Sequence, residues 1–103
     1  MSAFLSRVKG SFGSQLRVLI NAAAVTKVKE RTETVDGFEL MFQVNALSQF
    51  ATIEALAPIL IQNSPSSVVN VASALAGDLV LNDLHLTSRR FSFKTVYKQS
   101  KQA

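Results

Sequence analysis

Cysteine is absent from this chain, and histidine occurs only once, at position 85. Without cysteine, the chain can form no disulfide, no thiolate zinc site and no cysteine nucleophile. A single histidine also excludes a metal site built from several imidazoles. Any chemistry within these residues must therefore come from hydroxyl, amide, amine or carboxylate groups.

Lysine and arginine are missing from residues 32–88, which hold only acidic charged groups. The 11 basic side chains lie at the two ends and outnumber 7 acidic ones, giving a net charge of +4. A basic excess is typical of nucleic-acid-binding proteins, but no aromatic stacking platform is interleaved with these residues. We therefore expect two solvated ends flanking a buried middle, and no nucleic-acid partner. A small basic nucleic-acid-binding domain is the least favoured alternative.

No segment has the form of a signal peptide, because Arg7 and Lys9 interrupt the N-terminal apolar stretch. The uncharged run over residues 55–77 is long enough to span a bilayer, but prolines, amides and serines break it. The sequence predicts no membrane segment in this chain. A soluble protein in a reducing compartment is the expected setting.

The 103 residues are 48% hydrophobic and 17% charged, which suits one small domain with a core. Residues 16–21 and 68–72 are short apolar runs rich in β-branched side chains, typical of buried strands in a parallel sheet. A short helix is expected over residues 3–9, broken by Gly10 and Gly13. Another helix should begin near Phe93 or Lys94.

Between the two strands, apolar residues from Phe38 to Leu60 recur every three or four positions and predict one long helix. Asp36 or Thr34 is the expected N-cap, and Pro58 should kink the helix or end its regular part. The helix is apolar beyond one stripe, so we expect packing on more than one side. Strand, helix and strand make one βαβ unit with parallel strands. Ligands of such sheets bind beyond the carboxyl ends of the strands, here residues 21–24 and 72–73.

Tyr97 and Lys101 stand four positions apart in the predicted last helix, on one face and about one turn apart. A free tyrosine is a poor acid or base at neutral pH, but a nearby ammonium favours its phenolate form. Such a tyrosine can exchange a proton with an alcohol or ketone oxygen. Ser73 could hydrogen-bond the same oxygen, and the Asn45 amide could hold a relaying water. In isolation, the pair is equally compatible with an exposed tyrosine beside a solvated lysine.

Several segments, taken in order, resemble the short-chain dehydrogenase/reductase family, in particular its retinol-dehydrogenase-like members. They are residues 19–24 (LINAAA), 36–39 (DGFE), 42–45 (FQVN), 65–73 (PSSVVNVAS), 82–84 (NDL) and 97–101 (YKQSK). The family's counterparts include Leu-Ile-Asn-Asn-Ala-Gly at the strand end and Tyr-x-x-Ser-Lys on the last helix. The likeness implies an α/β fold, a partial Rossmann-like doubly wound parallel sheet. This chain would supply one βαβ unit and the start of the catalytic helix.

The resemblance implies a role for each of the four polar residues. Tyr97 is the catalytic acid/base, and Lys101 stabilises its phenolate and binds the nicotinamide ribose. Ser73 orients and polarises the substrate carbonyl or hydroxyl, and Asn45 completes the proton relay. The implied cofactor is NAD or NADP, with hydride passing between its nicotinamide and an alcohol or carbonyl substrate. The implied cofactor-binding residues are Asn21, Ala22, Ala23, Tyr97 and Lys101.

Several positions depart from the family pattern. Ala22 and Ala24 replace an Asn and a Gly of the strand-end motif, Ser48 replaces a Gly, and Ala72 replaces a Ser. Alanine removes side-chain hydrogen bonds at one place and adds a methyl at another where the backbone approaches the cofactor. Because all four catalytic positions are retained, these changes bear on cofactor affinity more than on chemistry.

The Gly-rich βα turn and the residue that selects NAD or NADP are missing from these 103 residues. We therefore expect residues 1–103 to be the central fragment of one NAD(P)-binding domain, inactive by itself. The alternative is a non-catalytic remnant acting as a binding or dimerisation module. In the family, the long helix and the tyrosine-bearing helix often form a homo-oligomer interface. The expected location is cytoplasmic, or membrane-associated through segments outside this range.

Overall fold

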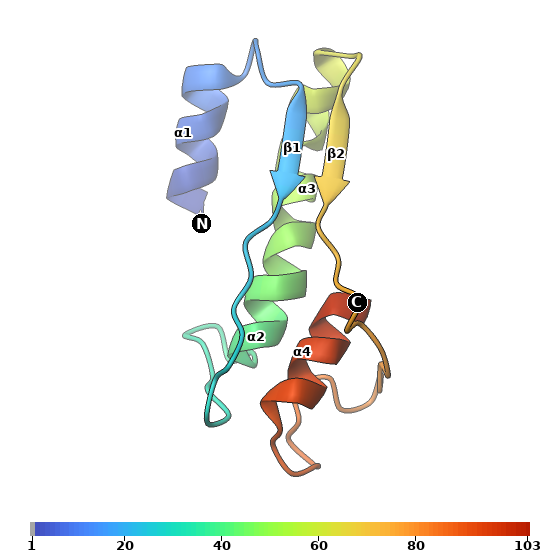
Figure 1. Ribbon diagram of the computed structural model, residues 1–103. Coiled ribbons are helices and arrows are strands. Elements are labelled where there is room, and N and C mark those ends of the chain that lie inside the picture. Colours follow the sequence, from blue (N-terminus) through green and yellow to red (C-terminus); the bar gives the residue numbers. More distant parts are fainter. Residues whose placement is uncertain (1) are drawn as a thin grey trace. The chain divides into compact units, whose positions relative to one another are not determined.

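The computed structural model describes residues 2–103 (Figure 1). In chain order the elements are α1 (Ser2–Phe12), β1 (Val18–Asn21), α2 (Leu40–Phe42), the π-helical turn η1 (Gln43–Leu47), α3 (Ser48–Gln62), β2 (Ser67–Asn70) and α4 (Phe93–Gln102). These residues form two compact units. The first contains the described residues up to 22 together with 49–71, and the second contains 23–48 and 72–103.

The first unit contains a two-stranded parallel sheet (Figure 1). Val18 pairs with Ser67, and Asn21 pairs with Asn70 at the other end of the ladder. A parallel pair requires a crossover between its strands, and the helix ending at Gln62 supplies it. The predicted βαβ unit with parallel strands is therefore confirmed, and the fold is α/β.

Asn63 and Gly13 fix the entry into this sheet. The Asn63 amide donates to the carbonyls of Gly13 (2.8 Å) and Leu16 (2.9 Å). The prediction that Gly10 breaks α1 is wrong, because a Cβ at Gly10 would meet nothing within 4 Å and the helix runs on to Phe12. A Cβ at Gly13 would lie 2.4 Å from the Lys9 carbonyl oxygen. The helix therefore ends where a side chain no longer fits.

The long helix begins later than the sequence predicts. Thr34 and Asp36 lie in a turn closed by a bond from the Thr34 N–H to the Phe38 carbonyl, with Gly37 at φ 81°. Glu39 is the N-cap: its Oε1 accepts from Met41 N (3.0 Å) and its Oε2 from Phe42 N (2.7 Å). The prediction of a Thr34 or Asp36 cap is therefore wrong. The Glu39 carboxylate satisfies two amides that a shorter side chain would satisfy singly.

The helix passes through Pro58 without ending there. Proline removes one backbone donor, which leaves the carbonyl of Glu54 without its helical partner. Both residues are exposed, so water can solvate that carbonyl. The predicted end at Pro58 is therefore not observed, and α3 continues to Gln62.

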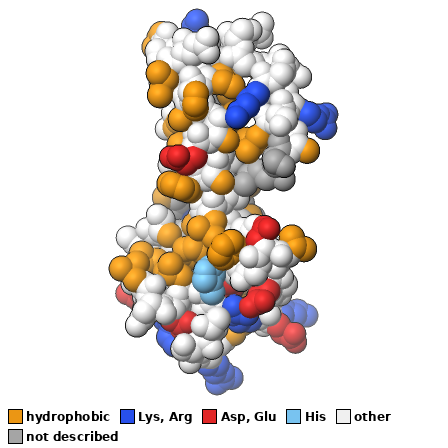
Figure 2. All heavy atoms as spheres, turned by 180° about the vertical axis from the view of Figure 1, so that it is seen from behind, with side chains coloured by type: hydrophobic (Ala, Val, Ile, Leu, Met, Phe, Trp, Pro, Cys, Tyr) orange, Lys and Arg blue, Asp and Glu red, His pale blue; other side chains and the backbone are white. Residues whose placement is uncertain are grey.

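The expected packing of the long helix on more than one side is wrong for α3. Only Leu56 and Leu60, four positions apart and so on one helix face, are buried in α3. Ile20 is 60% exposed and Ile61 72% exposed, and hydrophobic side chains appear across the surface in Figure 2. Two short strands and one helix present too few neighbours to cover each other's apolar faces.

Length and composition alone would allow the helix Leu40–Gln62 to cross a membrane. Core helices of soluble proteins pass the same test, so this finding is weak evidence. It concerns a helix that the sequence patterning did not single out as a membrane segment.

The second unit has a small apolar core of Met41, Leu86 and Val96. Four partly buried side chains pack against it: Val25, Val28, Phe91 and Tyr97. Residues 72–92 contain no helix or strand, as the sequence predicts, and α4 begins at Phe93 as predicted. The core therefore joins the start of the long helix, the irregular segment and α4.

Candidate active site

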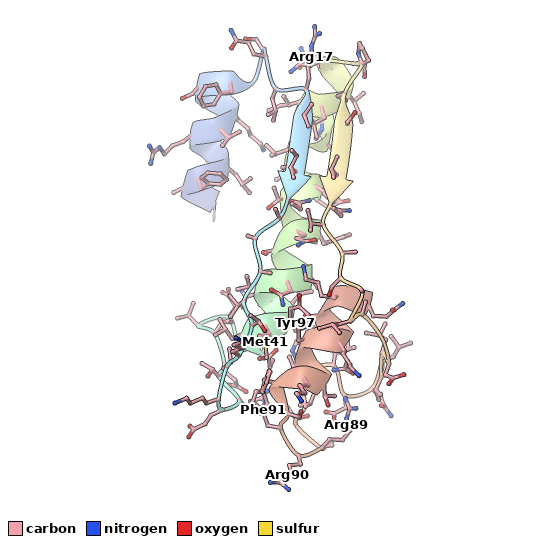
Figure 3. The ribbon with its side chains drawn as sticks, viewed as in Figure 1. Arg17, Met41, Arg89, Arg90, Phe91 and Tyr97 are labelled. Carbon is pink, nitrogen blue, oxygen red and sulfur yellow. The ribbon has the colours of Figure 1, made fainter. Side chains whose placement is uncertain are left out.

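Tyr97 and Lys101 lie on α4, which confirms the helical spacing that the sequence predicts for them. Both are partly buried, and the Tyr97 side chain packs against the core of Met41, Leu86 and Val96 (Figure 3). Four residues along a helix put the ammonium about one turn beyond the phenol on the same face. Tyr97 is therefore held by apolar contacts, and Lys101 follows it by about one turn on the same helix.

Asn45 is buried (2% exposed) in the π-helical turn η1, a kind of irregularity often found at functional sites. Its Oδ1 accepts from Val25 N (2.8 Å), and its Nδ2 donates to Val25 O (3.0 Å) and Ser100 Oγ (3.0 Å). Ser100 Oγ in turn donates to the Tyr97 carbonyl (2.8 Å). Asn45 thus connects the segment after β1 to the helix that carries Tyr97.

Ser73 lies just after β2, in the second unit with Asn45, Tyr97 and Lys101. Its Oγ accepts from Leu75 N (3.1 Å), which forms a local turn. Within the part of the chain that the structure describes, Ser73 makes no hydrogen bond to Tyr97 or Asn45. The structure therefore brings Asn45 to the tyrosine helix and leaves Ser73 engaged in its own turn.

Of the residues expected to touch a cofactor, Tyr97 and Lys101 lie on α4, whereas Asn21, Ala22 and Ala23 lie at and just beyond the carboxyl end of β1. Asn21 is buried, and its Nδ2 donates to Asn70 Oδ1 (2.8 Å) at the end of the neighbouring strand. Ala22 and Ala23 follow and are exposed. The Asn21 amide thus ties the two strand ends together, next to two exposed alanines.

Asp83, Arg89 and Gln99 form a polar network that the sequence did not reveal. Asp83 Oδ2 accepts from Arg89 Nε (2.9 Å), and Arg89 Nη2 also donates to Gln99 Oε1 (3.0 Å). The pKa of Asp83 is lowered from 3.8 to about 2, and the hydrogen bond from Arg89 is the largest cause. Desolvation opposes this effect, and the backbone amides of Ser88 and Thr87 add to it. Only the position of Asp83 within the family-like segment NDL hinted at this network.

His85 contacts the residue that caps the start of the long helix. Its Nδ1 accepts from Glu39 N (3.2 Å), and its carbonyl accepts from Arg31 Nε (2.8 Å). The ring lies 5.3 Å from the rings of both Phe38 and Phe42, and Figure 2 shows it bordered by hydrophobic side chains. Sequence patterning missed this role because the partners are 46 positions apart.

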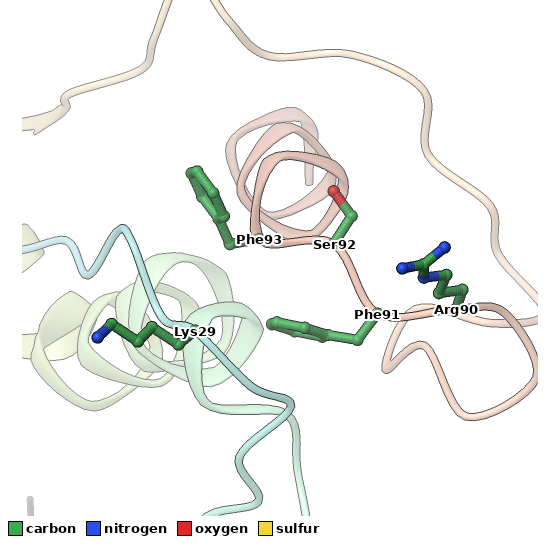
Figure 4. A pocket seen from close by; sticks show the side chains of 5 residues that line it. All are labelled: Lys29, Arg90, Phe91, Ser92 and Phe93. Carbon is green, nitrogen blue, oxygen red and sulfur yellow. The ribbon is translucent and has the colours of Figure 1, made fainter.

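A pocket of about 450 Å³ opens near the start of α4 (Figure 4). It is lined by Lys29, Arg90, Phe91, Ser92 and Phe93. None of the residues implied to be catalytic lines it. Among the described residues, no group of three His, Cys, Asp or Glu side chains could hold a metal ion.

Parallel strands joined through a long helix, followed by a helix with a Tyr-x-x-x-Lys pair, define an α/β protein with one βαβ unit of the kind that builds doubly wound sheets. A family model described as short chain dehydrogenase matches residues 1–83. The chain belongs to the short-chain dehydrogenase family.

The relatives are retinol dehydrogenases and another oxidoreductase. Retinol dehydrogenase 13 of Homo sapiens is 38% identical over 88 residues, covering 84% of this chain and 26% of that protein. Retinol dehydrogenase 14 of Mus musculus is 36% identical over 91 residues, covering 86% and 27%. Oxidoreductase calI of Penicillium decumbens is 32% identical over 97 residues, covering 88% and 28%. The retinol-dehydrogenase-like resemblance is confirmed, and the chain spans about a quarter of the length of these relatives.

Proposed function

We propose that this chain is the central segment of an NAD(P)-dependent oxidoreductase that interconverts an alcohol and a ketone or aldehyde. The observation that carries the proposal is the Tyr97–Lys101 pair on α4, with the tyrosine ring packed on a buried core. Membership of the short-chain dehydrogenase family and the names of the relatives support it.

Tyr97 moves the proton in this proposal. In the oxidative direction its Oη accepts the proton of the alcohol hydroxyl, and in the reductive direction it returns that proton. The Lys101 ammonium stabilises the negative charge on Oη, and Ser73 would hydrogen-bond the substrate oxygen after leaving its bond to Leu75. Asn45 would hold the water that renews the proton, through the free lone pair of its Oδ1.

When bound, NAD or NADP supplies the acceptor or donor of the hydride exchanged with the substrate carbon. The residues present suit its nicotinamide end. Ala23 is exposed and belongs to the same unit as Lys101, whose ammonium is a donor for ribose hydroxyls. Asn21 would act by holding the strand end to Asn70. The donors for the pyrophosphate are not among these residues, since no Gly-rich βα turn is present.

The longest product of the gene that contains residues 1–103 is the protein to assay. It should oxidise retinol or another apolar alcohol when NAD⁺ or NADP⁺ is added. Lys101→Met should lower turnover strongly, whereas Lys98→Met, an exposed lysine on the same helix, should leave it unchanged. Equal turnover in the two lysine variants would contradict the role given to Lys101.

The 103-residue chain alone should show no measurable NAD(P) binding in isothermal titration calorimetry. The reason is that the pyrophosphate normally contributes much of the affinity through a Gly-rich turn at a helix N-terminus. Micromolar affinity of the isolated chain would contradict this expectation.

A second candidate is a non-catalytic module that binds another chain. The specific observation in its favour is the exposed apolar sheet of the first unit, where Val18, Ile20 and Val69 lie on one face at 53%, 60% and 46% exposure. Sequencing the transcript on both sides of the coding segment separates the candidates. An in-frame Gly-rich βα turn upstream supports the enzyme, and stop codons on both sides support the module.

A further inference from the structure

The irregular segment over residues 78–92 is held to α4 by three polar side chains. Asp83 accepts from Thr87 N (2.9 Å), Ser88 N (3.2 Å) and Arg89 Nε (2.9 Å). Its carboxylate therefore holds residues 87–89 in a turn around itself. Arg89 then donates through Nη2 to the Asp83 carbonyl (3.0 Å) and to Gln99 (3.0 Å). A bidentate arginine of this kind fixes direction as well as distance.

Gln99 is the partner on the helix, midway between Tyr97 and Lys101. It is completely buried. Its Oε1 accepts from Val80 N (3.0 Å) as well as from Arg89, and its Nε2 approaches the carbonyl of Leu84 (3.4 Å). A fully buried amide is tolerated only when its polar atoms are satisfied, so α4 and the segment must keep this arrangement together.

The same segment contributes Leu86 to the apolar cluster against which Tyr97 packs. Leu86 has φ 51°, a left-handed backbone that a leucine adopts only when its surroundings impose it. Its N–H donates to the Asp83 carbonyl (3.2 Å), and its side chain is buried with Met41 and Val96. Tyr97 packs against this cluster. The polar network is therefore linked, through Asp83 and Leu86, to the cluster that supports Tyr97.

We propose that Asp83, Arg89 and Gln99 form a polar clamp that positions Tyr97 by holding Leu86 in the apolar cluster on which the tyrosine packs. These are positioning residues, because they act on the phenol through Leu86 and the core. The consequence for catalysis rests on the proposed function. The clamp itself is a property of this chain and can be tested without hydride transfer.

The composition of the chain provides a direct probe. Tyr97 is the only tyrosine and there is no tryptophan, so intrinsic fluorescence reports on Tyr97 alone. Time-resolved anisotropy then measures the freedom of this one ring. Arg89→Ala should cause loss of residual anisotropy, whereas Arg90→Ala should not. Figure 3 shows Arg90 pointing away from α4, and it is exposed.

A second set of variants changes Gln99, the member of the clamp on α4. Gln99→Leu should increase the motion of the Tyr97 ring. Gln99→Glu should keep the ring ordered, because its side chain still accepts from Val80 and Arg89. Gln102 is exposed, so Gln102→Leu is the matched control. Unchanged anisotropy in folded Arg89→Ala would overturn the proposal. If Arg89→Ala does not fold by circular dichroism, Arg89→Lys, which keeps the charge but loses the two-pronged contact, decides in the same way.

The effect of the clamp on catalysis is measured in the longest product of the gene. Arg89→Ala should lower kcat and leave the KM for the cofactor nearly unchanged, because none of the three clamp residues is implied to bind the cofactor and their effect on Tyr97 is expected to fall mainly on proton transfer. If the wild type shows no hydride transfer while the anisotropy differences persist, the proposed function fails and the clamp stands. If kcat of Arg89→Ala equals that of Arg90→Ala, the clamp's role in positioning is refuted.

Discussion

Asn45→Ala should destabilise the chain strongly, whatever its catalytic role. The substitution removes three hydrogen bonds, two to the backbone of Val25 and one to Ser100. A hydrogen bond contributes about 1 kcal/mol net, and a donor or acceptor left buried without a partner costs about 1–3 kcal/mol. We expect a loss of about 3 kcal/mol in the free energy of unfolding.

The assay is urea unfolding at pH 7, followed by circular dichroism. In a domain of this size, about 3 kcal/mol corresponds to a fall of roughly 10–20 °C in Tm, which a thermal scan would show independently. Asn82→Ala, an exposed asparagine in the irregular segment, is the matched control and should stay within about 0.5 kcal/mol of the wild type. If Asn45→Ala were equally mild, Asn45 could not be the connection between the segment after β1 and α4.

Three further predictions concern charge, capping and backbone space. The pKa of Asp83 is lowered from 3.8 to about 2 on folding, so its stabilising contribution is present above pH ~4 and is lost as the pH falls towards 2. Asp83→Asn should flatten that part of a stability–pH curve, and an unchanged curve would contradict the Arg89 contact. Glu39→Ala should cost about 1–2 kcal/mol in urea unfolding by uncapping the long helix, and a loss below about 0.3 kcal/mol would refute the capping role. Gly10→Ala should stabilise α1 by about 1 kcal/mol, whereas Gly13→Ala should destabilise it. The reverse order of Tm values would contradict the crowding at Gly13.

Local patterns predicted the elements that have strong local signals. The predicted strands over residues 16–21 and 68–72 became the paired strands Val18–Asn21 and Ser67–Asn70, the second of which ends two residues earlier than predicted. The four-residue spacing of Tyr97 and Lys101 became one face of α4. The start of the long helix was misplaced because its cap is a glutamate, whose longer side chain reaches two amides. Preferences for short polar caps do not identify such a residue.

The polar connections of the candidate site could not be predicted. Gln99 meets Val80 across 19 positions, and Asn45 meets Ser100 across 55. These partners come together through an irregular segment whose sequence has no periodic pattern. Glycine is the residue that usually indicates a left-handed backbone, but here the left-handed position is occupied by Leu86. The burial of the long helix was overestimated because apolar periodicity shows which face seeks a partner, and not whether one is present.

The most direct test of the central claim is hydride transfer by the Tyr97→Phe variant of the longest gene product. The substitution removes one hydroxyl and keeps the ring packed against the apolar core of the second unit. The account predicts that NAD(P)-dependent oxidation of the alcohol disappears while cofactor affinity, measured by calorimetry, stays near that of the wild type. Retained turnover in Tyr97→Phe would contradict the role of Tyr97 as the acid/base and with it the proposed function.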